Sequence, residues 1–304
     1  KADPPERIDR LYVKNAMGRM GLLPVKATIF PRDMKDAQAP RGKAIFPSDH
    51  AATLIEFRWV ETDGKTAGAF VPEPAAASPG IESGAPAKEE PGFSPTRIAW
   101  GSCFRESKPC PMLDVLAAEK PELYLALGDN IYGDTKDMGV LRMKYRRLAR
   151  QPGWQALTKT ARVMGTWDDH DYGADDSGAN YKPQQASKEI FLDFFDEPAG
   201  SERRKRDGVY TSTMLGEGDR RVQILMLDLR SFRSAILKAN PKAYPELGSY
   251  RPLLDDEEQV MLGEAQWAWL EEELRKPAAL RLIGLSTQLG AAHNGYEAWA
   301  NFPK

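Results

Sequence analysis

The sequence contains little cysteine and histidine, and it lacks any long apolar run. Two cysteines among 304 residues give no basis for a disulfide framework. No apolar stretch approaches the ~20 residues that a membrane-spanning helix needs, so we expect no transmembrane segment. A net charge of -2 gives no general attraction for nucleic acids or anionic membranes, and we expect no specific nucleic-acid recognition. With 41% hydrophobic and 28% charged residues, the composition is typical of a globular enzyme with a large core.

Proline marks a boundary in the first third of the chain. Residues 71–96 contain six prolines among alanine, serine and glycine, a composition that does not pack into a core. We interpret this segment as a linker between a small β-rich region, residues 1–70, and a catalytic region, residues 97–304. In the first region, residues 25–30 and 53–60 are predicted to be strands, and residues 62–65 a hairpin turn.

Strands and helices are predicted to alternate in the catalytic region. Short apolar runs predict buried strands at residues 97–100, 122–127, 161–167, 221–227 and 280–285. Helices are predicted at residues 112–120, 140–150, 185–196 and 256–275. This alternation is typical of an α/β domain. The segment 171–182, rich in Gly, Asp and Asn, is predicted to be a loop whose Tyr172, Tyr181 and Lys182 line a substrate entrance.

Chemically active side chains directly follow several of these strands. They are Cys103 after the first run, Asp129 after the second, Asp168, Asp169 and His170 after the third, and Asp228 and Arg230 after the fourth. Loops at the carboxyl ends of strands can bring such side chains into one crevice without disturbing the core. Carboxylates held together repel one another unless a cation lies among them, so the cluster indicates bound metal. Oxygen ligands suit Ca²⁺, Mg²⁺ or Mn²⁺, whereas a thiolate or phenolate favours iron or zinc, and we expect a mixed site.

The order and spacing of four motifs resemble the PhoD-like alkaline phosphatases, a branch of the metallophosphoesterases. The motifs are Gly-Ser-Cys at residues 101–103, Gly-Asp-Asn-x-Tyr at 128–132, Trp-Asp-Asp-His-Asp-Tyr-Gly at 167–173 and Asp-Leu-Arg at 228–230. Residues 263–270 and 294–303 are similar to two downstream blocks of that family. The resemblance covers roughly residues 97 to 304, and the ordered set of motifs is specific although each motif alone is weak.

This resemblance implies a two-sheet sandwich flanked by helices, with iron and calcium bound at the edge of the sheets. Cys103 and Tyr132 would be iron ligands, and Asp129 would bridge the metals. Asp169 matches a metal-binding asparagine of the wider superfamily, and His170 matches the histidine that faces substrate. Fe³⁺ and Ca²⁺ are therefore the expected cofactors, with Zn²⁺, Mn²⁺ or Mg²⁺ as alternatives that the ligand set leaves open.

The implied reaction is hydrolysis of phosphate mono- or diesters by a metal-activated water. Arg230 would bind a phosphate oxygen through directional hydrogen bonds that a lysine cannot reproduce. His170 would act as general acid at the leaving oxygen, a role that contributes about 10²- to 10⁴-fold. The substrate would be a small-molecule or polymer phosphate ester. The family suggests a periplasmic or secreted enzyme, with any export signal removed from a chain that starts at Lys1; the sequence gives no signal for the oligomeric state.

Each assignment has a structural alternative. Asp129 could simply close a turn, and Cys103 could be an ordinary buried cysteine. Tyr132 could be a core aromatic residue, because only its three-residue offset from Asp129 indicates that it binds metal. Arg230 could pair structurally with Asp228.

One family motif is missing from the sequence. The family continues to a Gly-Asp-x-His motif, whereas no Gly-Asp pair in this chain has a histidine two residues later. This departure favours a truncated or processed chain; completion of the site by another chain and an incomplete metal centre are the other interpretations. It keeps open a second function, that of a non-catalytic metal-stabilised protein or an incomplete fragment of such an enzyme.

Overall fold

Two five-stranded sheets form the centre of the protein. The computed structural model describes residues 11–15, 20–30, 52–61, 88–90, 92–238, 242, 259–289 and 297–302. The β9 sheet has the order β1 (Leu11–Asn15), β10 (Leu280–Gly284), β9 (Val222–Met226), β8 (Thr211–Leu215) and β4 (Lys88–Glu90). The β6 sheet has the order β2 (Met20–Phe30), β3 (Ala52–Glu61), β5 (Arg97–Gly101), β6 (Leu123–Leu127) and β7 (Arg162–Thr166).

The innermost strands are parallel and apolar. Strands β5, β6 and β7 run parallel to one another, and so do β9 and β10. Every residue of β6 and of β9 is buried. Continuous apolar sequence is expected for parallel strands that are covered on both faces. Antiparallel strands extend both sheets, with β1 beside β10, β8 beside β9 and β3 beside β5.

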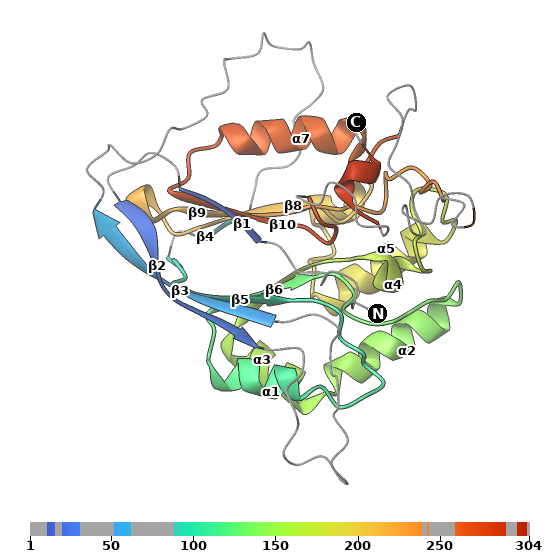
Figure 1. Ribbon diagram of the computed structural model, residues 1–304, viewed down its shortest axis with the longest axis horizontal. Coiled ribbons are helices and arrows are strands. Elements are labelled where there is room, and N and C mark those ends of the chain that lie inside the picture. Colours follow the sequence, from blue (N-terminus) through green and yellow to red (C-terminus); the bar gives the residue numbers. More distant parts are fainter. Residues whose placement is uncertain are drawn as a thin grey trace.

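The two sheets pack face to face, with helices on their outer sides. One buried cluster combines side chains of the β6 sheet, such as Leu125 and Leu127, with side chains of the β9 sheet, such as Ile224 and Leu282. Figure 1 shows α7 (Gly263–Arg275) over the β9 sheet, and α1 (Pro111–Ala118) and α3 (Pro152–Thr160) under the β6 sheet. The remaining α-helices of the described chain are α2 (Met138–Ala149), α4 (Asp169–Tyr172), α5 (Gln184–Phe194) and α6 (Glu202–Lys205). The mixed α/β class is thereby confirmed.

Local sequence explains where α2 begins and which face it buries. The Asp137 side chain caps the helix by accepting hydrogen bonds from the amides of Gly139 and Val140, at 2.8 and 3.2 Å. Leu141, Tyr145 and Leu148 are buried and follow a spacing of four and three residues. This spacing places the three side chains on one face, which packs against the core.

Strand β7 is the last strand of the β6 sheet, and side chains cover its outer edge. The Arg203 guanidinium donates to the Gly165 carbonyl at 2.8 Å. The Phe195 ring lies so close to Gly165 that any side chain there would collide with it. A side chain therefore uses one of the polar groups that an exposed edge strand would offer to another molecule.

The sequence predicts the elements of residues 97–304 well, with a few differences. The five predicted strands correspond to β5, β6, β7, β9 and β10, and the predicted helices to α1, α2, α5 and α7. Helix α7 starts at Gly263, and residues 259–262 before it are not helical. Strand β8 and helix α3 were not predicted. Tyr172 does not line an entrance, because its ring is completely buried in the core. Tyr181 and Lys182 do line a cavity, of about 420 Å³, and its role as a substrate entrance stays a prediction.

The N-terminal strands belong to the same two sheets. The strands predicted at 25–30 and 53–60 lie within β2 and β3, and β3 pairs with β5 of the catalytic region. Residues 62–87 and 91, which include the predicted hairpin turn and most of the predicted linker, lie outside the described residues. The domain boundaries at residues 70 and 96 therefore stay predictions. None of the helices in the described ranges is both long enough and apolar enough to cross a membrane.

Candidate metal centre

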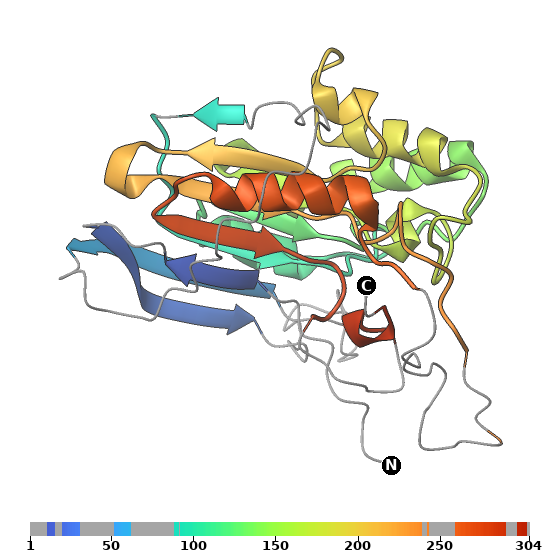
Figure 2. The ribbon, with the colours of Figure 1, turned by 90° about the horizontal axis from the view of Figure 1, so that it is seen from above.

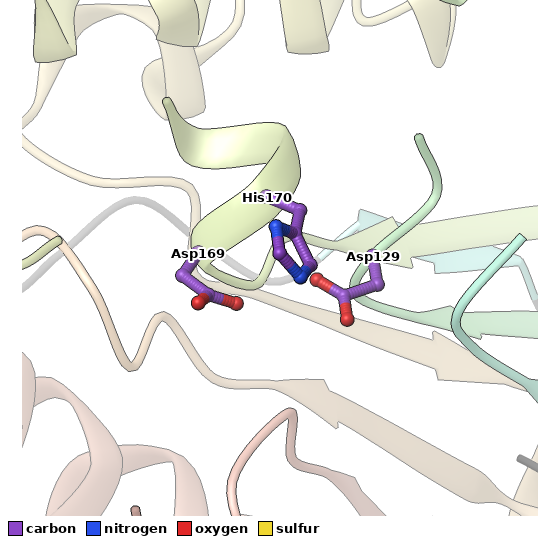
Figure 3. Close-up of side chains that lie close together, drawn as sticks. All are labelled: Asp129, Asp169 and His170. Atoms are coloured by element: carbon purple, nitrogen blue, oxygen red, sulfur yellow. The ribbon is translucent and has the colours of Figure 1, made fainter. Parts of the chain in front are cut away.

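Acidic side chains and an imidazole meet where β6 and β7 end. Asp129 follows β6, and Asp169 and His170 open α4 just after β7. One potential ligand atom from each of these three residues lies within 4.8 Å of the other two. Figure 3 shows the His170 ring between the two carboxylates. A second group, formed by Asp169, Asp176 and Glu297, is equally close, so Asp169 belongs to both groups.

Glu297 reaches this end of the molecule from the C-terminal part of the chain. Figure 2 shows β10 pointing toward the side on which the short 3-10 helix Trp299–Asn301 lies. The amide of Trp299 donates to the Gln288 carbonyl at 2.9 Å, which holds this helix beside the segment that follows β10. Residues from three separate parts of the sequence, around Asp129, Asp169 and Glu297, therefore converge at the carboxyl ends of the central strands.

A tight turn presents Asp129. Gly128 and Asp129 both have positive φ angles, 97° and 48°. A Cβ atom on Gly128 would lie 2.7 Å from Cβ of Asp168, so only glycine fits there. Cys103 also has a positive φ of 61°, and its amide donates to the Gly128 carbonyl at 3.3 Å. Its Sγ donates to Oδ2 of Asp129 at 3.2 Å, which joins two of the predicted ligands directly.

Asp171 fixes the two strand ends relative to each other. Its carboxylate accepts hydrogen bonds from the amides of Asp168 and Asn130, at 2.6 and 3.1 Å. The Asn130 side chain in turn donates to the Thr166 carbonyl at 2.9 Å. Burial raises the pKa of Asp171 to about 7, although these hydrogen bonds oppose the rise. Asp171 therefore holds the turns after β6 and β7 together through hydrogen bonds to their backbone amides.

The centre carries more negative charge than its own cations neutralise. Burial, together with the nearby carboxylates of Asp169 and Asp168, raises the pKa of Asp129 well above its usual range. Burial also raises the pKa of Asp168 to about 6, although Arg230 lowers it. Oδ1 of Asp129 is buried and has no hydrogen-bond partner among the described residues. A buried carboxylate oxygen in this state fits a cation-binding role.

His170 is oriented by a carboxylate on its outer side. Its Nδ1 lies 2.6 Å from Oδ1 of Asp134. Burial alone would lower the pKa of His170, but the hydrogen bond to Asp134 and the negative charges of Asp129 and Asp169 raise it to about 10. The protonated ring therefore directs its second N–H, on Nε2, toward the carboxylates of the centre.

Tyr132 joins the centre through its ring. The ring centroid lies 4.2 Å from that of His170, with 31° between the planes. The Tyr132 amide donates to a carboxylate oxygen of Glu106 at 3.1 Å. Together with the contacts described above, Cys103, Asp129, Tyr132, Asp169 and His170 form one connected set of side chains.

Arg230 also lies beside the centre, but carboxylates surround its guanidinium. Nη1 and Nη2 donate to the two oxygens of Glu297 at 2.9 and 2.8 Å, and Nε donates to Asp168 at 2.5 Å. The side chain is 1% exposed. Burial alone would lower the pKa of Arg230, but Asp168 and Glu297 raise it well above its usual value. Only the Arg230 amide contacts Asp228, whose carboxylate also binds the Trp167 ring nitrogen and the amides of Val209 and Ser231.

Three nearby residues were not singled out from the sequence as parts of the site, and Asp168, although named in the acidic cluster, received no role of its own. Asp134 follows the Gly-Asp-Asn-x-Tyr motif, so proximity in sequence could have indicated it. Asp176 lies in the predicted loop, and Glu297 in a downstream block of the family. Their roles depend on contacts over long sequence separations, which a single sequence does not show.

The donor set fits bound metal. A thiol, several carboxylates and an imidazole converge, and such mixed donors suit a transition metal beside a hard cation. The partnerless, buried oxygen of Asp129 is the observation that supports this fit most directly.

Comparisons with known proteins identify the family of this chain. The family model of the PhoD-like phosphatases matches residues 98–298, more than half of the chain, and the chain therefore belongs to that family. No curated protein matches the sequence. The solved structure of PhoD is similar, with 15% sequence identity and a TM-score of 0.42. The match covers 74% of this chain and 44% of that one, so this chain spans less than half the length of the solved protein.

Proposed function

We propose that the protein hydrolyses phosphate mono- or diesters at the centre around Asp129, with the sandwich fold of a metallophosphoesterase. Membership of the PhoD-like phosphatase family supports the reaction class. The observation that carries the proposal is the convergence of Asp129, Asp169 and His170 within 4.8 Å. The substrate is a small-molecule or polymer phosphate ester, and the enzyme is exported, to a compartment in which calcium is plentiful.

The metal-binding residues in this proposal are Cys103, Asp129, Tyr132 and Asp169, with iron and calcium as the cations. Asp129 is the bridging candidate, because it contacts the Cys103 thiol on one side and belongs to the group with Asp169 on the other. When bound, such cations supply Lewis acidity that neutralises phosphate charge and activates water. Positive charge would also lower the raised pKa of Asp129, because it offsets the repulsion from neighbouring carboxylates.

His170 is the general acid in the proposed reaction. Asp134 accepts the hydrogen bond of Nδ1, which leaves the proton on Nε2 directed toward the centre. Against the effect of burial, the hydrogen bond to Asp134 raises the pKa of His170, which favours the protonated ring. Nε2 can therefore give its proton to the departing ester oxygen, and Asp134 stabilises the charge that is present before the transfer.

The predicted phosphate contact of Arg230 requires a change of partners. Its donors are directed at Asp168 and Glu297, so a phosphate would have to replace one of these carboxylates. Bound cations would compete with Arg230 for the carboxylates of Asp168 and Asp169. Once these carboxylates bind cations, the Arg230 guanidinium can turn toward a substrate. The direct phosphate contact of Arg230 is thus the part of the proposal that depends most on the metals.

The test uses protein freed of metal with a chelator and then supplied with iron, calcium, or both. Turnover of p-nitrophenyl phosphate and of the bis-ester is measured in each state, together with the metal content by elemental analysis. We expect hydrolysis only in the reloaded protein. Reloaded protein that binds metal and resists unfolding better, yet hydrolyses neither ester, would instead identify a non-catalytic, metal-stabilised protein.

A further inference from the structure

An exposed arginine lies against the Tyr132 ring beside the centre. Arg105 lies on the loop after β5, two residues beyond Cys103, and its side chain is exposed. Its guanidinium carbon lies 4.3 Å from the centroid of the Tyr132 ring. The same ring contacts His170, at 4.2 Å between centroids. These two ring contacts connect Arg105 to the candidate general acid.

The backbone on each side of Arg105 is anchored to the loop that carries the candidate ligands. The Phe104 amide donates to the Asp129 carbonyl at 2.9 Å. Glu106 is 5% exposed, and its carboxylate accepts the hydrogen bond from the Tyr132 amide. The Gln151 side chain donates to the Glu106 carbonyl at 3.1 Å. Arg105 is thus held at a fixed place, which lowers the entropy lost when its side chain binds a ligand.

The charge around Arg105 differs from the charge around Arg230. Asp168 and Glu297 occupy the donors of Arg230, which is buried. Among the described residues, no carboxylate forms an ion pair with Arg105. The Arg105 side chain contacts the Tyr132 ring. Stacking on an aromatic face leaves the N–H groups of a guanidinium at its edge, where they can donate to an anion. A planar guanidinium matches two phosphate oxygens at once.

We propose that Arg105 binds non-bridging oxygens of the substrate phosphate beside the candidate metal centre. The proposal rests on the phosphoesterase function proposed above. Arg105 brings a positive charge to a centre whose own carboxylates would otherwise repel an approaching phosphate. Tyr132 then has two tasks, because its ring supports Arg105 while it contacts His170.

The test measures binding of inorganic phosphate to metal-loaded protein by calorimetry, and kcat and KM for p-nitrophenyl phosphate. Arg105→Ala should weaken phosphate binding about 10- to 100-fold, the range expected for lost hydrogen bonds to a charged group. KM should rise more than kcat falls, while metal content and the urea midpoint stay unchanged. Arg105→Lys keeps the charge without the planar fork, and it should lie between the wild type and Arg105→Ala.

Arg220 provides the matched control. It is an exposed arginine just before β9, at the opposite end of the central strands. Arg220→Ala removes the same charge from the protein, and it should leave phosphate binding unchanged. Equal losses in the two variants would mean that net charge, and not the position of Arg105, governs binding, which would overturn the proposal.

The outcomes separate this proposal from the proposed function. If neither ester is hydrolysed but phosphate binding depends on Arg105, the hydrolase proposal fails, and the part of the Arg105 proposal that stands is its contact with phosphate. If the esters are hydrolysed and Arg105→Ala binds phosphate as the wild type does, the Arg105 proposal fails and the hydrolase proposal stands. Wild-type protein that binds no phosphate overturns the Arg105 proposal in either case.

Discussion

Two buried arginines near β7 occupy opposite electrostatic surroundings. Arg230, at the carboxyl end of the strand, is enclosed by carboxylates that raise its pKa. Arg203 lines a cavity of about 560 Å³ beside the same strand, and none of the residues of the candidate metal centre lines that cavity. Arg203 donates to the carbonyls of Val209 and Gly165, at 2.6 and 2.8 Å. Burial lowers its pKa to about 10, although Glu197 opposes this shift.

The comparison shows where negative charge is concentrated in the fold. Beside β7, one buried arginine meets backbone carbonyls and a single carboxylate, and the region is nearly balanced. At the carboxyl ends of the strands, Arg230 and its neighbours leave a surplus of carboxylate, including the partnerless oxygen of Asp129. A large cavity alone is therefore a weaker guide to function here than a concentration of unbalanced charge.

The largest expected effect comes from removing Asp129. Asp129→Ala should lower turnover of p-nitrophenyl phosphate by about 10³-fold or more and should abolish metal binding, because the central candidate ligand is lost. The metal-free variant should unfold at higher urea than metal-free wild type, since the repulsion among buried carboxylates is relieved. Asp219→Ala, at an exposed position before β9, serves as the control and should change neither quantity. Retained metal in Asp129→Ala would contradict the ligand assignment.

Removing His170 should separate chemistry from metal binding. His170→Ala should lower kcat by about 10²-fold or more, because the general acid is lost. Metal content, measured by elemental analysis, should stay close to that of the wild type. The opposite pattern, unchanged kcat in the metal-loaded variant together with lost metal, would make His170 a ligand and not an acid.

Paired substitutions test the contrast between the two arginines. Glu297→Gln removes one partner of a buried charge and should reduce the free energy of unfolding by about 3 kcal/mol. Glu197→Gln should cost less than about 1 kcal/mol, since Arg203 keeps its carbonyl partners and Glu197 is partly exposed. Urea titrations of both variants measure the difference. Equal reductions in the free energy of unfolding would contradict the difference that the contacts of the two arginines indicate.

The smallest expected effect is a shift in pH dependence. Asp134 raises the pKa of His170, so the acid form is present below that pKa and activity falls as the pH rises through it. Asp134→Asn should lower the pKa and move the alkaline limb of the kcat profile to lower pH. A profile measured from neutral to alkaline pH checks this direction. An unmoved limb would mean that another group controls activity there.

The fold was predictable where local sequence decides the structure. Continuous apolar runs identified β6 and β9 because these strands are buried on both faces, and the same runs located Asp129 and Asp228 at their ends. Strand β8 lacks a continuous apolar run, so it was not predicted. Asp169 and His170 lie on the short helix α4, and the Trp-Asp-Asp-His-Asp motif alone does not predict a helix there. Strand β3 pairs with β5 across the segment that composition marks as a linker, and a single sequence does not show a pairing over such a separation.

The sequence predicted several residues that lie together at the candidate site, but not the residues that they contact. The motif order indicated Cys103, Asp129 and His170, and the structure places them together. The sequence suggested that Arg230 could pair with Asp228, whereas its guanidinium meets Asp168 and Glu297. That pairing joins residues 62 and 67 positions apart, and only the completed fold brings them within reach.

The hydrogen bond from Arg203 to Gly165 has a consequence for behaviour at high concentration. An unprotected edge strand can form backbone hydrogen bonds with a strand of a neighbouring molecule, and such pairing can start aggregation. With this carbonyl engaged by a guanidinium and the adjacent space filled by the Phe195 ring, that route is closed. Solutions of an Arg203→Ala variant should therefore scatter more light on storage than the wild type, before any loss of secondary structure is detectable.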